Sequence, residues 1–251
     1  MLIPVIDIDI PYLDTGQMIE VDRAMMDDYR ISLFQMMENA GRCLAMLTRE
    51  RFLQGDAKGK AITVLAGNGG NGGGALVAAR RLHNWGAHVT VSLAKPEEKM
   101  MPVPLQQLGI LKHMGVSCTV GAEIPTAAES PAVIIDGLIG YSLKGVPYGA
   151  THDLIVWANA HKAPVLALDT PSGIDTATGT VFDPVISATA TMTLALPKQG
   201  LRQADAIKHV GELYLADISV PPSLYQKPPL ELDVGPIFSI SDVVRLNLHY
   251  S

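Results

Sequence analysis

The sequence predicts an α/β fold in which a mainly parallel β-sheet is covered by helices on both faces. Two observations lead to this prediction. Short apolar runs rich in β-branched residues alternate with segments whose apolar residues recur at helical spacing. A cluster of glycines at 67–74 separates the first of these runs from a helical segment, as in turns that bind an anion at a helix N-terminus. With 251 residues, 48% of them hydrophobic and 18% charged, the chain can bury a sizeable core.

Two helices are expected before the first strand. Asp14 or Thr15 can cap the first, whose apolar positions recur at three- or four-residue spacing. These positions are Met18, Val21, Ala24 and Met25. The second helix is expected over about residues 33–54, and its apolar face consists of Phe34, Met37, Ala40, Leu44 and Leu47.

A β-α-β unit is predicted after residue 59. Residues 61–65 form a short β-branched run, residues 75–85 return to helical spacing, and residues 89–93 form a second strand. A crossover of this length is right-handed and makes the two strands parallel. The alternation then continues with helices at 105–114 and 153–161 and strands at 117–120, 132–136, 165–169, 188–196 and 212–218.

The whole chain, residues 1–251, is predicted to form a single domain. No change in composition divides it before about residue 221. The segment 221–236 is rich in proline, so we expect residues 221–251 to form a tail packed on the surface of the domain.

Charge and cysteine usage exclude several classes of protein. The net charge is −6 and no run of Lys or Arg stands out, which argues against a nucleic acid or an anionic membrane as the main partner. Cys43 and Cys118 form neither a CxxC pair nor a zinc-ligand spacing, as expected in a reducing compartment. The N-terminus has no basic region and no apolar stretch of bilayer length, so it is interpreted as mature protein in the cytoplasm.

Three polar, glycine-containing loops follow predicted strands. They lie at residues 66–75, 136–145 and 169–175. Because ligands of open parallel sheets bind outside the carboxyl ends of the strands, the three loops together predict a binding site at one edge of the sheet. One such loop alone would be weak support.

The glycine cluster predicts phosphate binding more strongly than it predicts a dehydrogenase. Several consecutive glycines allow backbone N–H groups to converge on an anion, whereas a tight turn, the alternative, needs only one or two. Gly67, Gly69 and Gly72 match the pattern GxGxxG of dinucleotide sites. Such sites also require an acid at the end of the second strand, where this chain has only residues 92–95, Ser-Leu-Ala-Lys. An ordinary NAD-dependent dehydrogenase is therefore disfavoured.

The other two loops contain candidate polar ligands. Asp136 ends a strand and could bind a cation, while Lys144 could contact a phosphate; a helix cap and a solvated lysine are the alternatives. Asp169 is followed by Thr-Pro, which fixes an extended turn and holds the carboxylate at the edge of the sheet. A carboxylate held in this way suits acid–base chemistry, and Ser172 offers an oxygen to a cation or ligand, although capping remains an alternative here too.

The order of these motifs resembles that of the YjeF N-terminal domain family, the NAD(P)H-hydrate epimerases. The resemblance covers about residues 17–222 and rests on four blocks in order, with A-L-P-K at 195–198 and V-P-P at 220–222 also fitting. The blocks are M-x-x-x-D at 18–22 with M-E-N-A-G at 37–41, the glycine cluster, D-x-x-x-G-x-x-x-x-G at 136–145, and D-x-P-S-G at 169–173.

The resemblance implies a Rossmann-like three-layer αβα sandwich that often forms homodimers. It implies an isomerase that interconverts the R and S forms of hydrated NADH or NADPH, with a separate dehydratase acting downstream. The family's potassium ligands correspond to Asn71, Asp136 and Ser172, and its catalytic, substrate-contacting carboxylate corresponds to Asp169. The family's two substrate loops correspond to Gly70, Asn71, Gly72, Gly73, Gly74 and to Gly140, Tyr141, Ser142, Leu143, Lys144, Gly145, Val146.

The glycine cluster departs from the family pattern G-x-G-N-N-G-G-D-G. Gly70 replaces an Asn, Gly74 replaces the Asp, and Ala75 replaces the last Gly. The missing Asp removes a charge and an acceptor from the substrate loop. Two alternatives follow: a catalytically impaired nucleotide-binding or scaffold module on the same fold, and a different nucleotide- or phosphate-sugar-binding enzyme.

Overall fold

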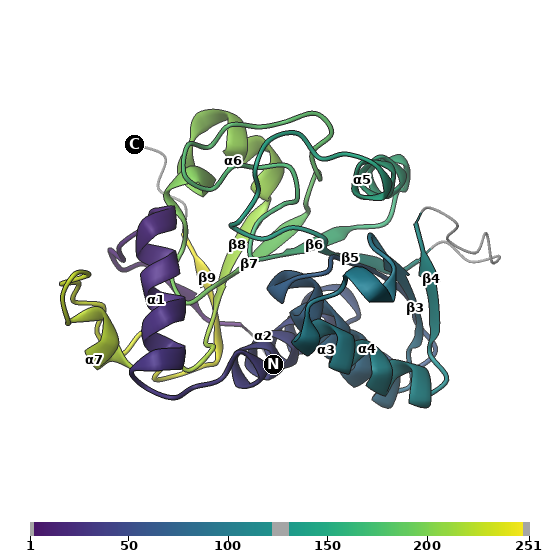
Figure 1. Ribbon diagram of the computed structural model, residues 1–251, viewed down its shortest axis with the longest axis horizontal. Helices are drawn as coiled ribbons and strands as arrows, with labels where there is room; N and C mark the ends of the chain where they lie inside the picture. The colour runs from purple at the N-terminus through teal and green to yellow at the C-terminus, as the bar shows by residue number, and fades with distance from the viewer. Residues whose placement is uncertain (1–2, 122–130, 248–251) are drawn as a thin grey trace.

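The computed structural model describes residues 3–121 and 131–247, which contain one nine-stranded sheet (Figure 1). Its strands are β1 (Val5–Ile6), β2 (Ala61–Ala66), β3 (His88–Leu93), β4 (Ser117–Val120), β5 (Val133–Gly137), β6 (Val165–Leu168), β7 (Ala190–Leu194), β8 (Glu212–Ala216) and β9 (Val243–Leu246). They are arranged in the order β1-β9-β8-β7-β6-β5-β2-β3-β4. Neighbouring strands of the described chain are parallel except β8 and β9, which are antiparallel. The predicted mainly parallel sheet is confirmed.

The strand order places a switch point between β2 and β5. From β2 the chain proceeds outward through β3 to β4, then returns to β5 on the other side of β2 and continues through β6, β7 and β8. The loops that leave β2 and β5 therefore turn in opposite directions and open a crevice at the carboxyl ends of these strands. This is where a doubly wound sheet binds its ligand.

Helices cover both faces of the sheet, as the three-layer prediction requires. They are α1 (Thr15–Asp27), α2 (Leu33–Leu47), α3 (Gly70–Asn84), α4 (Pro102–His113), α5 (Ala150–Ala160), α6 (Ala204–Val210) and α7 (Pro222–Tyr225). In Figure 1, α2, α3 and α4 lie on one side of the strands, and α5 and α6 lie on the other. Within this described part, no helix is long and apolar enough to cross a membrane.

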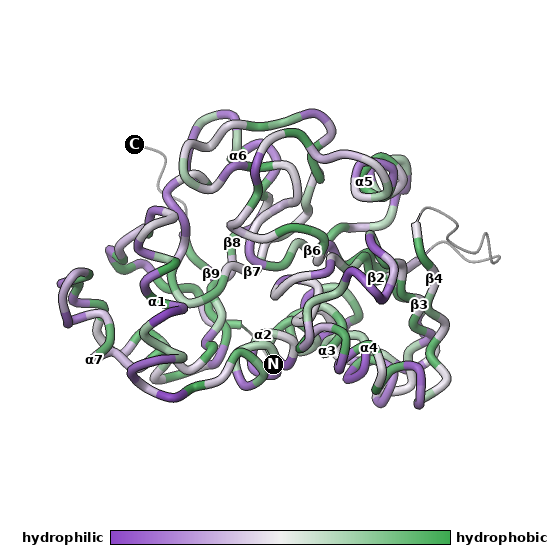
Figure 2. Tube along the Cα trace, viewed as in Figure 1, coloured by the Kyte–Doolittle hydropathy of each residue, from purple (hydrophilic) through white to green (hydrophobic). Residues whose placement is uncertain are grey.

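Alternation along the strands divides the core between the two faces. On β8, Leu213 and Leu215 pack with residues of α1 and α6, whereas Tyr214 and Ala216 pack against the cluster that contains α2 and α3. A third cluster joins Ile134 of β5 to α5. Successive side chains of a strand point to opposite faces, so a sheet covered on both sides needs apolar residues at nearly every strand position. Figure 2 shows the hydrophobic colours along the central strands accordingly.

The helix starts follow from capping, with one difference at the glycine cluster. Asp14 caps α1 as expected, accepting from the backbone N–H of Gln17 at 2.8 Å. The helix expected at 33–54 is α-helical to Leu47 and continues as a π-helical turn to Phe52. By contrast, α3 begins at Gly70, inside the glycine cluster, five residues before the expected start. Poor helix propensity of glycine is overcome there by close packing, described below.

The proline-rich tail contains structure that the sequence pattern did not predict. It includes α7 and β9, and the described part of the tail ends at residue 247, so residues 248–251 of the predicted tail lie outside it. Val243 and Val244 of β9 are fully buried, and β9 pairs with both β8 and β1. This part of the tail is therefore integrated into the sheet rather than laid over the surface.

Candidate active site

The three predicted loops meet at one cleft of about 410 Å³ at the carboxyl ends of the strands. Six predicted substrate-loop residues line it: Gly70, Asn71, Gly140, Tyr141, Ser142 and Asp169. The other predicted residues do not line the cleft. Gly72, Gly73 and Gly74 are buried beneath it in α3, and the loop from Leu143 to Val146 lies outside it. The structure thus brings together the start of each predicted loop.

The buried glycines of α3 permit close contacts with the backbone and with α2. A Cβ atom on Gly72 would lie 2.0 Å from the carbonyl oxygen of Gly67, and one on Gly73 would lie 2.3 Å from the sulfur of Met37. No side chain fits at either position without moving its surroundings. The N-terminal N–H groups of α3, which have no partner within a helix, are thereby held at the surface of the cleft.

Gly74, where the family pattern has Asp, has a tight environment of its own. Its Cβ position lies 3.0 Å from Cδ2 of Leu168 and 3.6 Å from Cβ of Ala40, and both of these residues line the cleft. A larger residue here would require the end of the Leu168 side chain to move. In this chain an apolar contact occupies the place of the missing carboxylate.

Asp136 and Ser172 form a buried polar pair behind the cleft. The Ser172 hydroxyl donates to Oδ1 of Asp136 at 2.7 Å, and the Ser172 backbone N–H donates to Oδ2 at 2.8 Å. A third donor is the backbone N–H of Leu138, 3.1 Å from Oδ1. Asp136 is fully buried, and this burial raises the pKa of its carboxyl group to about 6 despite the hydrogen bonds. The partners are neutral, so a nearby cation would stabilise the ionised form.

Asn71 lies at the first turn of α3 and reaches the exit of β6. Its Nδ2 donates to the carbonyl oxygen of Leu168 at 3.0 Å. A Cβ atom on Gly140 would lie 3.4 Å from Cγ of Asn71 and 3.3 Å from Oδ2 of Asp169, so both side chains converge on this glycine. The absence of a side chain at 140 keeps the space between the amide and the carboxylate open.

Asp169 adopts an uncommon backbone conformation for a residue other than glycine. Its φ is +67°, a left-handed conformation that Asp tolerates better than most residues. Oδ2 accepts from the backbone N–H of Tyr141 at 3.2 Å, and Oδ1 accepts from that of Leu194 at 3.4 Å. The side chain is aimed between three strand exits and is only 4% exposed. Such strained backbone is common at functional sites.

Lys198 is the charged partner of Asp169. Its ammonium group forms an ion pair with Oδ1 of Asp169 and also donates to the Thr193 hydroxyl at 3.2 Å and to the Leu194 carbonyl at 2.9 Å. The lysine is 1% exposed. A lysine this deeply buried requires a paired carboxylate, since an isolated charge is strongly disfavoured away from water.

A second carboxylate, Asp22 of α1, also lines the cleft. The hydroxyl of Tyr141 donates to Oδ2 of Asp22 at 2.5 Å. Burial raises the pKa of Asp22 above its ordinary value, and the hydrogen bond from Tyr141 opposes that rise. The cleft therefore contains two carboxylates in different environments, one paired with a lysine and the other hydrogen-bonded to a phenol.

The remaining walls are rich in methionine. Five methionines line the cleft: Met18, Met26, Met36, Met37 and Met101. Methionine side chains are polarisable and adapt their shape, and they make favourable contacts with flat rings. The cleft thus offers a soft apolar surface beside its two carboxylates.

Sequence reasoning did not assign Lys198 or Asp22 to the site, although both lie in motif blocks that it noted. The signal for Lys198 was its place shortly after a strand, at the same edge of the sheet as the loops. Asp22 had no such signal, because it lies on a helix that only tertiary packing brings to Tyr141. Near the end of β3, the Ser92 hydroxyl donates to the carbonyl of Gly121 at 2.7 Å.

The fold and the cleft define a doubly wound α/β protein with a ligand site at the switch point of the sheet. More specifically, residues 33–200 match the family described as YjeF-related protein N-terminus, and the chain belongs to this family.

The relatives of the chain carry names from cofactor repair. An NAD(P)H-hydrate epimerase of Dehalogenimonas lykanthroporepellens is 39% identical over 90% of this chain and 89% of its own length. A bifunctional NAD(P)H-hydrate repair enzyme Nnr of Salinibacter ruber is 33% identical over 84% of this chain, which spans 41% of that protein. The crystal structure of yeast ynu0, YNL200c, superposes with a TM-score of 0.78 over 94% of this chain and all of that one, at 23% identity, and shows the same fold.

Proposed function

We propose that this protein is an isomerase, an NAD(P)H-hydrate epimerase that interconverts the R and S forms of hydrated NADH or NADPH. The observation that carries the proposal is the buried Asp169–Lys198 pair, which opens onto a methionine-lined cleft at the switch point. The names of the relatives described above support the same reaction.

The reaction inverts a ring carbon that carries a hydroxyl group beside a ring nitrogen. The C–O bond breaks when the hydroxyl takes up a proton and leaves as water, while the nitrogen lone pair forms a C=N bond. Water then adds from the opposite face and loses a proton. This sequence needs a proton donor and a proton acceptor but no redox partner.

Two carboxylates of the cleft are suited to these roles. Asp169, paired with Lys198, would act as the acceptor and orient the hydroxyl or water. Asp22 would act as the donor; burial raises its pKa above the ordinary value, the direction that suits a general acid. Lys198 contacts Asp169 rather than the cleft, so we assign it a positioning role.

The glycine cluster would hold the phosphates of the substrate. The first N–H groups of α3, at Gly70 and Asn71, have no partner within the helix, and they lie at the wall of the cleft. An anion at this position also benefits from the helix dipole.

Asn71, Asp136 and Ser172 would hold a potassium ion, which would supply positive charge beside the substrate. The residues present suit it: potassium prefers oxygen ligands, and the buried Asp136 carboxylate accepts only from neutral donors. The described residues contain no group of three or more His, Cys, Asp and Glu side chains that could hold a metal ion.

Three further properties belong to the proposal. We expect a homodimer located in the cytoplasm, and a separate dehydratase that acts downstream on the S form. The bifunctional repair enzymes among the relatives are more than twice as long as the segment that this chain matches, which leaves room in them for a second activity.

The test is to follow the equilibration of R and S forms of hydrated NADH and NADPH with purified protein in potassium buffer and in sodium buffer. We expect faster equilibration with the protein, more so in potassium, and loss of this acceleration in Asp22→Asn. No acceleration by wild-type protein in either buffer would refute the proposal.

A catalytically impaired binding or scaffold module remains the second candidate, because an apolar contact replaces the family's Asp at Gly74. This candidate predicts binding of nucleotide-like ligands without conversion. Under it, Gly74→Asp gains little activity, whereas a large gain would show that the residue alone limits catalysis.

A further inference from the structure

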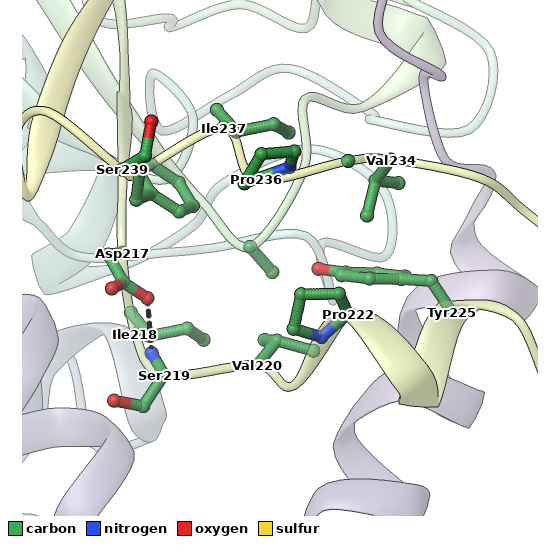
Figure 3. A pocket seen from close by; sticks show the side chains of 13 residues that line it. Asp217, Ile218, Ser219, Val220, Pro222, Tyr225, Val234, Pro236, Ile237 and Ser239 are labelled. Atoms are coloured by element: carbon green, nitrogen blue, oxygen red, sulfur yellow. Dashed lines mark hydrogen bonds between the residues drawn. The ribbon is translucent and has the colours of Figure 1, made fainter.

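A second cavity, of about 320 Å³, lies at the same edge of the sheet next to the cleft. Its walls come from the chain that leaves β8 (residues 217–220), from α7, and from the segment 234–239 (Figure 3). Ile218 lines both this cavity and the cleft, and Ala195 follows directly on the end of β7. Its size is at the lower end of the range of small-molecule sites. None of the roles assigned above uses this cavity.

The hydroxyl group of Tyr225 is buried at this cavity without a hydrogen-bond partner among the described residues. The side chain is 3% exposed, and Figure 3 shows the hydroxyl directed into the space beside Pro222 and below Pro236. Buried hydroxyl groups nearly always find a partner, so an orphan at a cavity wall indicates a missing one. Burial first and Asp217 second hold the pKa of Tyr225 above its ordinary value, so the phenol stays neutral and can donate.

Asp217 brings a carboxylate to the same cavity. Its Oδ1 accepts from the backbone N–H of Ser219 at 2.6 Å, which fixes the side chain at the exit of β8. In the described chain Oδ2 has no hydrogen-bond partner of its own. An ionised carboxylate only accepts hydrogen bonds, so a ligand must present a donor to it.

Apart from Ser219 and Ser239, the other side chains that line the cavity are apolar. Pro222 and Pro236 border the cavity on two sides, and Val234 and Ile237 lie beside them (Figure 3). A planar ring suits such walls, because it buries both faces against apolar carbons while its polar edge meets the two polar groups.

We propose that this cavity is a binding site for an adenine-type base, whose amino group donates to Asp217 and whose adjacent ring nitrogen accepts from Tyr225. The donor and acceptor lie side by side on this edge of adenine. A free nucleoside and the adenine end of a larger cofactor present the same edge, and the experiment below separates them. The inference does not depend on the epimerase reaction.

The first experiment compares adenosine with inosine by isothermal titration of the full-length protein. Inosine has the same size, but it carries an acceptor in place of the amino group and a ring N–H in place of the acceptor. We expect adenosine to bind at least about tenfold more tightly than inosine. Equal binding of the two, or no binding of adenosine, would overturn the proposal.

Two variants tie binding to the cavity. Tyr225→Phe removes only the orphan hydroxyl, so adenosine affinity should fall about tenfold while the melting temperature of the free protein stays the same or rises. The matched control is Tyr214→Phe, another buried tyrosine, whose hydroxyl donates to Glu212 at 2.6 Å. The control should melt at a lower temperature and bind adenosine as wild type does. The reverse pattern would show that the Tyr225 hydroxyl has no ligand.

Asp217→Asn supplies a second, independent test. The amide can still accept from Ser219 and can donate to the ligand, so the preference should shift from adenosine towards inosine. An unchanged preference would exclude Asp217 from the site.

Competition identifies the source of the base. If intact NADH displaces adenosine from wild-type protein, the cavity takes the adenine end of the dinucleotide; if both bind together, it takes a separate nucleoside. Under conditions where Asp169→Asn remains folded, it should bind adenosine as wild type does even though it abolishes epimerisation. Failure of the epimerase assay therefore does not affect this test, and failure of adenosine binding does not affect the epimerase proposal.

Discussion

The cleft has two kinds of wall, which differ in how the sequence produces them. The turn from β2 into α3 acts through missing side chains: glycines at 72 and 73 let the backbone approach closely and expose N–H groups at the helix start. The exits of β5 and β6 act through buried charge, with Asp136 beside Ser172 and Asp169 beside Lys198. The first wall has no room for a Cβ atom at Gly72 or Gly73, whereas the second depends on keeping both partners of each pair.

The two walls differ in what they cost the stability of the folded protein. The glycine wall has an entropic cost of roughly 0.5–1 kcal/mol for each glycine in the helix, but it removes no charge from water. The charged wall costs stability at all times, since each charge is removed from water and is compensated only by its partner. Mutations of the two walls should therefore differ in magnitude, in pH dependence and in how they can be rescued.

The largest effect is expected at the Asp169–Lys198 pair. Asp169→Asn leaves the lysine charge buried without its counter-ion and should lower the free energy of unfolding by about 3–5 kcal/mol. Adding Lys198→Met should recover most of the stability but none of the activity. Chemical denaturation of both variants measures this, and a double variant as unstable as the single one would show that the ion pair is not the cause.

The next effect is the pH dependence due to Asp136. Burial raises its pKa from the ordinary value of 3.8 to about 6, so the folded state binds the proton more tightly than the unfolded state does. The resulting stabilisation is present below about pH 4 and is lost as the pH rises through 6, a loss of about 3 kcal/mol.

Denaturation of wild type and Asp136→Asn between pH 4 and pH 7.5 isolates this contribution. As the pH rises, the free energy of unfolding of wild type should fall relative to that of Asp136→Asn. Potassium should reduce this loss of wild-type stability above pH 6. A pH-independent difference would mean that Asp136 is already ionised at pH 4 in the folded protein.

Substitutions in the glycine wall are expected to change the stability of the protein by an amount that does not depend on pH. Gly72→Ala places Cβ about 2 Å from the Gly67 carbonyl and should cost about 1–3 kcal/mol or more, as overpacking does. Gly109→Ala in α4 is the matched control, because nothing lies within 4 Å of its Cβ position, and it should stabilise the protein by up to about 1 kcal/mol. Equal effects of the two substitutions would contradict a packing role for Gly72.

The sequence predicted the two walls to different extents. Strands with continuous apolar runs, such as β2 and β5, and helices with clear periodicity, such as α2, were found within a few residues. The start of α3 at Gly70 was missed because propensity disfavours glycine in helices, and only the contacts with Gly67 and Met37 compensate for it. The two-residue β1 and the four-residue β9 are too short for a periodic signal.

The polar residues of the site show the same limit. Asp136, Asp169 and Ser172 follow strands whose carboxyl ends must meet, so topology alone predicts that they cluster. The pairing of Lys198 with Asp169, and of Asp22 with Tyr141, depends on side-chain directions in the packed fold. Local patterns do not determine such directions.

The most direct test of the central claim is the rate at which purified protein equilibrates the R and S forms of hydrated NADH, measured for wild type, Asp169→Asn and the exposed control Asp153→Asn. The account predicts that Asp169→Asn loses acceleration by about 10²–10⁴-fold under conditions where it remains folded, while Asp153→Asn matches wild type. Equal rates for wild type and folded Asp169→Asn would contradict the assignment of Asp169 as the catalytic carboxylate.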